Sequence, residues 1–159
     1  MKLLFICLGN ICRSPMAETI MRHITEKANL ADKIEIDSAG LIGYHEGETS
    51  DSRMISHAKR RGYIITHISR KIRRSDFEYF DKILCMDDQN FDKLIDLSET
   101  KEETDKIERI TDYCTQHVID HVPDPYYGGA QGFENVIDIL EDACSNLLNT
   151  INEDLKKEE

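Results

Sequence analysis

Residues 3–15 read Leu-Leu-Phe-Ile-Cys-Leu-Gly-Asn-Ile-Cys-Arg-Ser-Pro, and the rest of the chain is organised around this stretch. Its first four residues are apolar and typical of a buried strand, which places Cys7 at the carboxyl end of that strand. Gly9 and Asn10 tolerate left-handed backbone, so they predict a tight loop. Pro15 suits the first turn of a helix, where a missing N–H costs nothing. The stretch therefore predicts a cysteine held between a strand end and a helix start.

This predicted loop has the chemistry of an anion site. Free N–H groups of the loop and the helix start form a concave site for a tetrahedral anion, and the fork of Arg13 matches phosphate oxygens. In such a site the sulfur of Cys7 is favoured as a thiolate nucleophile, and the hydroxyl of Ser14 can donate to it. The alternatives are a buried cysteine beside a Gly-Asn turn with Arg13 on the surface, and Ser14 as a simple polar residue of the helix start.

Strands and helices alternate along the rest of the chain. Apolar residues at helical spacing predict a helix from Pro15 to about residue 28. The other expected elements are a strand over 33–40, a helix from 51 or 52 that stops at Gly62, a helical turn capped at Ser75, a strand over 82–86, a helix opening at 87–88, a surface loop over 98–106, a strand over 107–110, a loop over 111–132 and a long helix from Gln131 whose tail frays after Asp154.

This alternation is typical of an α/β fold. We expect a four-stranded parallel sheet of order 2-1-3-4 with helices on both faces, forming a single Rossmann-like or flavodoxin-like domain over residues 1–159. In such sheets the ligand lies at the carboxyl end of the first strand, beside the point where the strand order reverses. Cys7 occupies that place, so topology and local chemistry agree.

Composition narrows the class of protein. A chain of 159 residues with 40% hydrophobic content can bury the core of one domain. The apolar stretches are too short for a signal peptide or a membrane span, so we expect a cytoplasmic protein without membrane insertion. The net charge of -11 disfavours nucleic-acid binding. Five cysteines at irregular spacing predict reduced thiols, and no pattern indicates a metal or another cofactor.

The charge is unevenly distributed along the chain. Residues 1–74 contain 13 Lys and Arg against 8 Asp and Glu, whereas residues 75–159 contain 7 against 23. The basic stretch 59–74 could meet an acidic substrate. Most such runs are solvated faces, and that interpretation is favoured here.

One carboxylate stands out as a possible proton donor. A thiolate that attacks phosphorus needs a leaving group that receives a proton, and a carboxylic acid on a loop over the site is the usual source. Asp124 lies between Pro123 and Pro125, which stiffen its backbone. The alternative is that this Asp-Pro pair is ordinary turn chemistry, but in combination with Cys7 and Arg13 the acid is favoured.

The chain resembles the low-molecular-weight protein tyrosine phosphatases. The stretches that carry the resemblance occur in order along nearly the whole chain and are Cys7-Leu8-Gly9-Asn10-Ile11-Cys12-Arg13-Ser14-Pro15, Asp37-Ser38-Ala39-Gly40, Ile83-Leu84-Cys85-Met86-Asp87 and Asp124-Pro125-Tyr126-Tyr127. The resemblance implies that Cys7 is the nucleophile, Arg13 the phosphate clamp and Asp124 the general acid. It also implies phosphotyrosine proteins as substrates, inorganic phosphate as product and a metal-independent cysteinyl-phosphate intermediate. We expect a monomer by default.

The same resemblance gives roles to further residues. The phosphate-binding loop is formed by Leu8, Gly9, Asn10, Ile11, Cys12 and Ser14. Ser38 and His67 look like the support that holds Asn10 and this loop in shape, although by itself His67 would be taken as an ordinary loop histidine. The cleft walls are implied to be Tyr44, His45, Tyr126 and Tyr127, which are otherwise ordinary partly buried residues.

Cys12 lies in the same loop as Cys7. The resemblance implies a reversible disulfide between the two that protects the nucleophile from over-oxidation. The alternative is that Cys12 is a small packing residue.

Three alternative functions are weighed against tyrosine phosphatase activity. Arsenate reduction on the same fold needs a cysteine relay after the third strand, and no cysteine follows Cys85 until Cys114. Relatives that act on phosphoarginine have Thr where this chain has Ile11, so the bulky Ile11 favours tyrosine. A catalytically inactive phosphate-binding module would not need Cys7, Arg13 and Asp124 together.

Overall fold

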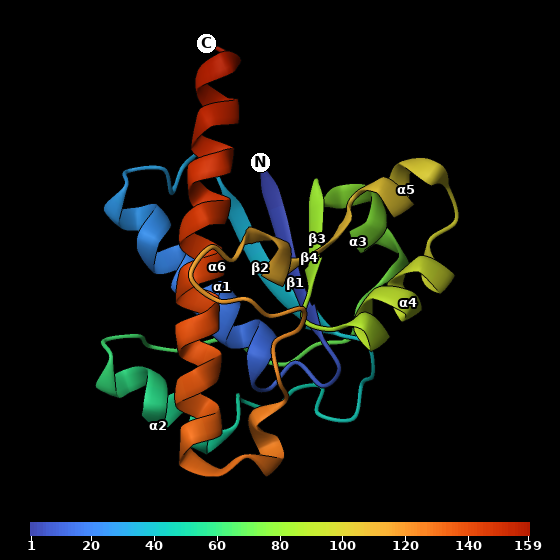
Figure 1. The fold of residues 1–159 in the computed structure, drawn as a ribbon. Coiled ribbons are helices and arrows are strands. Elements are labelled where there is room, and N and C mark those ends of the chain that lie inside the picture. Colours follow the sequence, from blue (N-terminus) through green and yellow to red (C-terminus); the bar gives the residue numbers. More distant parts are fainter.

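The computed structural model contains one sheet of four parallel strands in the order β2-β1-β3-β4 (Figure 1). The strands are β1 Lys2–Cys7, β2 Glu35–Gly40, β3 Lys82–Cys85 and β4 Ile107–Arg109. This order confirms the predicted sheet. The structure describes residues 1–159 except for the side chain of Tyr127. β1 pairs with a neighbour on each side, and its register sets Cys7 opposite Gly40 of β2.

Helices cover both faces of the sheet, as predicted (Figure 1). One face is covered by α1 Arg13–Lys27 and the long α6 Gly129–Lys157, with α2 Ser52–Arg60 packed against α6. The other face is covered by α3 Arg74–Tyr79 and α4 Asp88–Leu97, and α5 Lys101–Asp105 contacts β4. Short 3-10 helices occur at Ile110–Tyr113 and Pro125–Tyr127.

The side chains of β1 alternate between two hydrophobic cores. Leu3 and Phe5 belong to the core beneath α1 and α6, whereas Leu4 and Ile6 belong to the core beneath α3 and α4. All four are fully buried, and burial of each such side chain contributes about 1.5–3 kcal/mol. The alternation places Cys7 on the α1 side of the sheet, because successive side chains of a strand point to opposite faces. Packing of β1 thus determines where the cysteine lies.

Helix α6 differs from its prediction at both ends. It begins at Gly129, where φ is 65° and glycine has no steric penalty, rather than at Gln131. It continues to Lys157 instead of fraying after Asp154, and Leu155 still packs against the core. Although α6 is 29 residues long, no helix in the described part of the chain has an apolar stretch that could cross a membrane.

Two local predictions between residues 73 and 106 are wrong. Helix α3 is not capped at Ser75: its N-cap is Arg73, whose backbone N–H donates to the Asp76 carboxylate at 2.7 Å. The expected surface loop over 98–106 contains α5, because the hydroxyl of Thr100 accepts from the N–H of Glu103 and starts a helical turn. Polar capping side chains, which an apolar pattern does not reveal, determined both cases.

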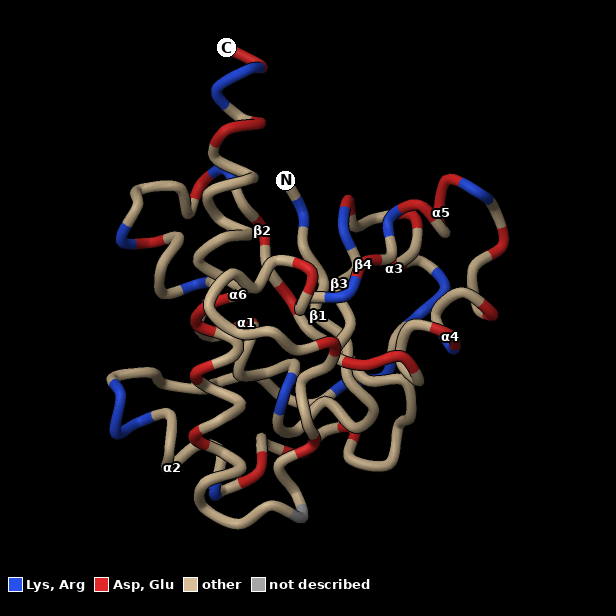
Figure 2. The backbone as a smooth tube through the Cα atoms, in the orientation of Figure 1, with Lys and Arg blue, Asp and Glu red and all other residues tan. Residues whose placement is uncertain are grey.

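The interpretation of residues 59–74 as a solvated face is wrong for its best-anchored arginines. Arg61 forms ion pairs with Glu134, Asp138 and Glu141 of α6, a helix along which acidic residues recur (Figure 2). Arg70 is mostly buried and pairs with Asp37 and Asp76. Basic residues of the N-terminal half are therefore partly neutralised by ion pairs with acidic residues of the C-terminal half.

Candidate active site

The loop between β1 and α1 presents unused N–H groups. Three of its carbonyls accept hydrogen bonds from other segments: Leu8 O from the N–H of Leu41 and Ile42, Gly9 O from the Ser69 hydroxyl and Ile11 O from the N–H of Asp51. In contrast, no hydrogen bond of the described residues has a backbone N–H of residues 8–12 as its donor. Helix α1 also begins without a side-chain cap or an acidic residue in its first turn. These N–H groups are therefore available to an anion, which is what the predicted anion site requires.

Asn10 makes most of the side-chain hydrogen bonds that hold this loop. Its φ is 57°, in the left-handed region, and its side chain is fully buried. The amide nitrogen donates to the hydroxyls of Ser14 at 2.8 Å and Ser38 at 3.1 Å, and the amide oxygen accepts from the N–H of Arg70 at 3.0 Å. Asn10 thus links β1, α1 and β2 through one side chain, in the arrangement that the sequence analysis predicted.

The same network orients a hydroxyl toward the sulfur of Cys7. Since the Ser14 hydroxyl accepts from Asn10, its own hydrogen is available for Cys7 Sγ at 2.9 Å. Cys7 and Ser14 are both buried. A hydroxyl that donates to sulfur favours the thiolate over the thiol, so the predicted contact is present.

His67 supports Asn10 from the outside of the loop. Its Nε2 lies 2.7 Å from Asn10 Oδ1, an oxygen that also accepts from the Arg70 N–H, so Nε2 must donate. Its Nδ1 lies 3.0 Å from Oε1 of the buried Glu18. Burial alone would raise the pKa of Glu18, but hydrogen bonds from His67, Ser38 and Arg22 outweigh it and lower that pKa. With the Glu18 carboxylate beside Nδ1 and the Asn10 amide oxygen beside Nε2, both ring nitrogens of His67 face hydrogen-bond acceptors.

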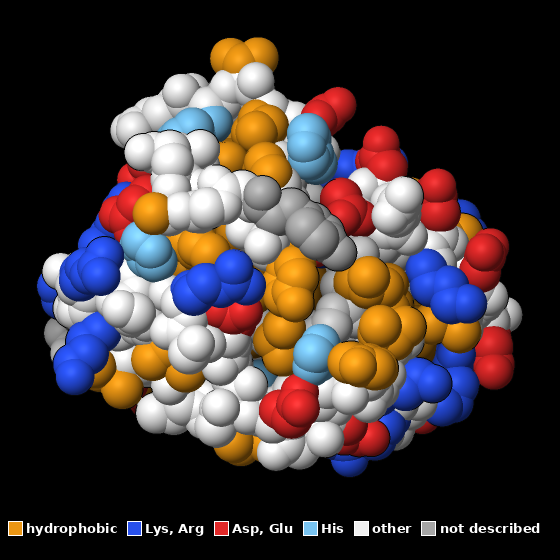
Figure 3. All heavy atoms as spheres, turned by 90° about the horizontal axis from the view of Figure 1, so that it is seen from below, with side chains coloured by type: hydrophobic (Ala, Val, Ile, Leu, Met, Phe, Trp, Pro, Cys, Tyr) orange, Lys and Arg blue, Asp and Glu red, His pale blue; other side chains and the backbone are white. Residues whose placement is uncertain are grey.

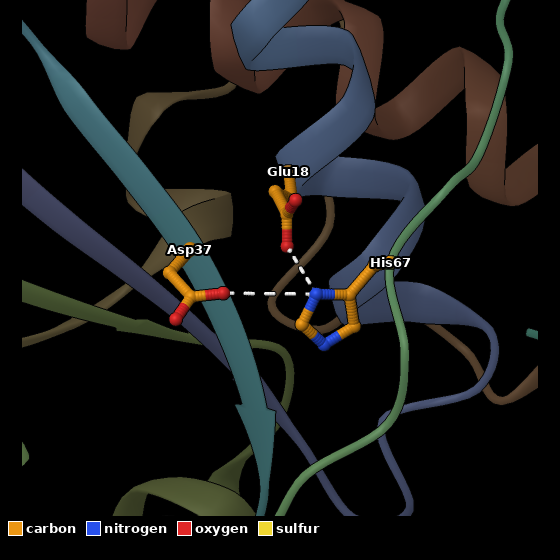
Figure 4. Close-up of side chains that lie close together, drawn as sticks. All are labelled: Glu18, Asp37 and His67. Atoms are coloured by element: carbon orange, nitrogen blue, oxygen red, sulfur yellow. Dashed lines mark ion pairs between the residues drawn. The ribbon is translucent and has the colours of Figure 1, made fainter. Parts of the chain in front are cut away.

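Glu18 and His67 also form a group with Asp37 that has to be tested as a metal site. Ligand atoms of the three residues lie within 4.8 Å of one another (Figure 4). However, Glu18 already accepts from Ser38 at 2.7 Å as well as from His67, and the near oxygen of Asp37 accepts from the Ser38 N–H. The ligand atoms of these three residues are therefore already engaged in the contacts that support the loop.

Arg13 lies at the start of α1 with its guanidinium buried. Nη1 donates to the Asp87 carboxylate at 2.8 Å and to the Val122 carbonyl at 3.0 Å. Burial opposes its charge, but the nearby Cys7 and Asp87 outweigh burial and raise the pKa of Arg13 above its ordinary value. Asp87 lies two residues after the end of β3, so a second strand end contributes to the same edge of the sheet.

A cleft of about 220 Å³ opens above Cys7 and Arg13. Figure 3 shows the face at the carboxyl ends of the strands, where hydrophobic side chains gather around a hollow. The lining residues are Cys7, Leu8, Gly9, Ile11, Cys12, Arg13, Ile42, Tyr44, His45, Asp124 and Tyr126.

Asp124 reaches this cleft from the loop before α6. Its carboxylate is exposed and accepts from the Tyr126 N–H at 3.0 Å. Tyr44 is exposed at the rim, and its ring meets the His45 ring edge to face. The structure thus brings the predicted loop, acid and wall residues together, while the side chain of Tyr127 lies outside the described residues.

Cys12 lines the cleft as well and is buried. Burial, and then the negative charge of Asp51 and Cys7, raise the pKa of the Cys12 thiol well above its usual range. Of the two loop cysteines, Cys7 has the Ser14 hydroxyl within hydrogen-bond distance of its sulfur, whereas the raised pKa of Cys12 favours its neutral thiol.

Sequence reasoning missed four residues around the site. Glu18 contacts His67, and Asp87 pairs with Arg13. Ile42 lines the cleft, and Arg53 lies over the ring of Tyr126, another lining residue. Asp87 could have been found, because it follows a buried strand at the edge where parallel strands place their ligands. Glu18 could have been suspected because it lies one helical turn after Ser14, on the same face of α1.

Comparisons with known proteins agree with this fold and site. The sequence profile of the family described as low molecular weight phosphotyrosine protein phosphatase matches residues 2–158. A putative low molecular weight protein-tyrosine-phosphatase of Synechocystis is 47% identical over 98% of this chain and 99% of its own.

Solved structures give the same result. A protein tyrosine phosphatase of Entamoeba histolytica, crystallised with Hepes in its active site, is 50% identical, with a TM-score of 0.94 over 96% of this chain and 97% of that one. A Drosophila arginine phosphatase is 34% identical, with a TM-score of 0.88 over 95% of this chain and 98% of that one.

Fold, coverage and identity define the class of this protein as a protein tyrosine phosphatase, a hydrolase. The chain belongs to the low molecular weight phosphotyrosine protein phosphatase family. The resemblance seen in the sequence is thereby confirmed.

Proposed function

We propose that this phosphatase hydrolyses phosphotyrosine in proteins, and small aryl phosphates, through a cysteinyl-phosphate on Cys7. The observation that supports this most is that Cys7, Arg13 and Asp124, from three distant parts of the chain, line one cleft. Arg13 and the free N–H groups of residues 8–12 are the phosphate-binding groups of the proposal.

The first step transfers the phosphoryl group to the enzyme. The Cys7 thiolate attacks phosphorus in line, so that an S–P bond forms as the P–O bond to the leaving group breaks. Asp124, in its acid form, gives its proton to the leaving oxygen and becomes a carboxylate. Arg13 and the loop N–H groups stabilise the equatorial oxygens, where negative charge is concentrated.

The second step returns the enzyme to its starting state. Asp124 accepts a proton from water as the water oxygen attacks phosphorus and the S–P bond breaks. Inorganic phosphate leaves, Cys7 is again a thiolate and Asp124 again carries a proton. The Ser14 hydroxyl, 2.9 Å from Cys7 Sγ, stabilises the sulfur as leaving group. No step uses a metal or another cofactor.

The shape of the cleft supports an aryl phosphate as substrate. Apolar and aromatic residues, among them Leu8, Ile11, Ile42 and Tyr126, line the cleft. A flat phenyl phosphate can extend from Cys7 past these walls, whereas the short side chain of phosphoserine leaves them uncovered. Ile11 offers no polar group to a guanidinium, which favours tyrosine over arginine even though an arginine phosphatase shares the fold.

We also propose that peroxide regulates the site through Cys7 and Cys12. Peroxide oxidises the Cys7 thiolate to a sulfenic acid; Cys12 sulfur then attacks it, so that the S–S bond forms and water leaves. The raised pKa of Cys12 makes it the second thiol to react, not the first. A peroxide-treated sample without a Cys7–Cys12 linkage by mass spectrometry would contradict this part of the proposal.

Hydrolysis by matched variants tests the main proposal. Wild type, Cys7→Ser and Asp124→Ala are assayed with p-nitrophenyl phosphate and with phosphotyrosine, phosphoserine and phosphoarginine peptides. We expect Cys7→Ser to lose more than about 10³-fold in kcat, and the control Cys114→Ser, which removes a thiol that does not line the cleft, to keep wild-type activity. Undiminished turnover by Cys7→Ser would overturn the mechanism, and preference for phosphoarginine would overturn the substrate.

Two further parts of the proposal concern the surroundings of the enzyme. We propose that it acts as a monomer, since the cleft is completed by residues of one chain. We also propose a cytoplasmic location, where the free thiols of Cys7 and Cys12 are kept reduced. Analytical ultracentrifugation tests the monomeric state. Reactivation of the oxidised enzyme by thioredoxin tests whether it is suited to a reducing compartment.

A further inference from the structure

Arg53 joins the two sides of the cleft. It lies in the first turn of α2, and its guanidinium pairs with Asp51 through Nη2–Oδ2 at 2.9 Å and Nε–Oδ1 at 3.2 Å. Its Cζ also lies 5.0 Å from the ring centroids of both Tyr126 and Phe133, and Nη1 approaches the Tyr126 carbonyl at 3.5 Å. One side chain therefore contacts α2, α6 and the segment that follows Asp124.

The partner of Arg53 is bonded to the phosphate loop. The backbone N–H of Asp51 donates to the Ile11 carbonyl at 2.9 Å, and the Asp51 carboxylate caps α2 by accepting from the N–H of Arg53 and Met54. Burial alone would raise the pKa of Asp51, but hydrogen bonds from Arg53 outweigh it and lower that pKa. Asp51 is thus an ionised and fixed anchor beside the loop.

The segment with Asp124 is attached at both of its ends. Upstream, the Val122 N–H donates to the Met86 carbonyl at 2.7 Å and the Val122 carbonyl accepts from Arg13. Downstream, the Tyr126 N–H donates to the Asp124 carboxylate, and Tyr126 is the residue beneath Arg53. Asp124 itself is exposed, so its position over Cys7 depends on these attachments.

We propose that Arg53 is a positioning residue that holds Asp124 over the cleft by clamping Tyr126 to the Asp51 anchor of the phosphate loop. The planar guanidinium suits this task, because its edge pairs with a carboxylate while its face lies on aromatic rings. The inference rests on the proposed function of Asp124 as general acid and adds a residue through which that acid is aimed.

The leaving group reveals whether an acid is correctly aimed. p-Nitrophenolate leaves readily without a proton, whereas phenolate and the tyrosine side chain need one. A misplaced Asp124 therefore slows phenyl phosphate and phosphotyrosine more than p-nitrophenyl phosphate. Since kcat/KM reports the steps up to transfer of the phosphoryl group, it is the quantity to compare.

The experiment compares Arg53→Met, Arg53→Lys, Asp124→Asn and the double variant Arg53→Met with Asp124→Asn on these substrates. We expect Arg53→Met to lose about 10-fold in kcat/KM on phenyl phosphate and less than about 3-fold on p-nitrophenyl phosphate, a part of what a general acid supplies. Arg53→Lys should fall between, because it keeps the charge without the fork. The double variant should match Asp124→Asn alone.

Two controls separate positioning from loss of structure. Vanadate, which binds the phosphate loop, should inhibit Arg53→Met with an unchanged constant. Arg60→Met removes an exposed arginine from the other end of α2 that has no ion pair within the described residues, and should behave as wild type.

Equal losses on all substrates, a weaker vanadate affinity or no loss at all would each overturn the role of Arg53. If Asp124→Asn itself leaves the ratio between substrates unchanged, the general-acid function of Asp124 fails, and the role of Arg53 fails with it. That result is distinguishable from one in which Asp124→Asn changes the ratio and Arg53→Met does not, which overturns the role of Arg53 alone.

Discussion

The phosphate loop and the segment around Asp124 contribute to one cleft but are held in different ways. Asn10, Ser14 and Ser38 of the loop network are fully buried and hydrogen-bonded to one another. Asp124 is exposed, and the residues on either side of it are held by hydrogen bonds at Val122 and Tyr126 and by packing of Pro125 against α6.

This difference follows from the physics of buried polar groups. A buried amide or hydroxyl without a partner costs about 1–3 kcal/mol, so the loop network has to be completed for the chain to fold. An exposed carboxylate has no such requirement. Changes in the loop are therefore expected to reduce stability and activity together, whereas changes at Asp124 reduce activity alone.

Asn10→Ala should have the largest effect, because it removes the hydrogen bonds of the loop and also strains its backbone. It removes the bonds to Ser14, Ser38, His67 and the Arg70 N–H and puts alanine at φ 57°. We expect a loss of about 3–5 kcal/mol in the free energy of unfolding and of about 10²-fold or more in kcat/KM. Urea unfolding and steady-state kinetics measure both. Asn10→Gly, which tolerates the left-handed backbone, should recover only the smaller, conformational part; full recovery would show that the network is unimportant.

Asp124→Asn should separate activity from stability. The amide oxygen can still accept from the Tyr126 N–H, so we expect the free energy of unfolding to change by less than about 0.5 kcal/mol. Without a transferable proton, kcat/KM on phenyl phosphate should fall by about 10²-fold. A destabilisation comparable to that of Asn10→Ala would refute the contrast between the two regions.

Glu18→Gln tests the outer support of the loop. It removes the buried carboxylate that faces His67 Nδ1 and accepts from the Ser38 hydroxyl, and loss of a partner from such a buried network costs about 1–3 kcal/mol in the free energy of unfolding. Because Glu18 acts on the cleft indirectly, through His67, Ser38 and Asn10, the expected loss in kcat/KM is smaller, about 10-fold. Glu26→Gln, at an exposed position of the same helix, should be neutral. Equal behaviour of the two variants would remove Glu18 from the network.

Asp142→Asn tests the α6 carboxylate that holds residues 115–117, at the start of the loop that leads to Asp124. Burial raises the pKa of Asp142, but hydrogen bonds from the His117 ring and the N–H groups of residues 115–117 lower it to about 2. The unfolded carboxyl titrates near pH 3.9. The carboxylate therefore stabilises the fold above about pH 4, and this contribution is lost as pH falls toward 2.

The expected result is a loss of about 1–2 kcal/mol at pH 5 that shrinks toward pH 2.5, measured by urea unfolding of wild type and Asp142→Asn. Asp142 does not line the cleft, so kcat/KM at pH 5 should change by less than about 2-fold. A stability difference that grows with acidity would contradict the lowered pKa.

Much of the fold was predictable because its signals are local. The apolar β1 next to Gly9, Asn10 and Pro15 indicated strand, turn and helix, and the alternation of elements indicated the sheet. Prediction failed where a polar side chain decided the structure, as in the Thr100 cap of α5 and the Asp76 contact that starts α3. The same limit applies to the basic stretch, since Arg61 pairs with acids 73 or more positions away and Arg70 pairs with Asp37, 33 positions away, as well as with the nearby Asp76.

The sequence by itself pointed to Cys7, Arg13 and Asp124 as the nucleophile, clamp and acid of the proposed mechanism, because they are chemical types at positions that turn and strand patterns already locate. Only the tertiary structure decided what holds them. Glu18 lies against His67 Nδ1, Asp87 pairs with Arg13, and Arg53 contacts both Asp51 and Tyr126, which are separated by about half of the chain. Such contacts depend on direction and distance between side chains from separate elements, and these exist only once the sheet and its helices have packed.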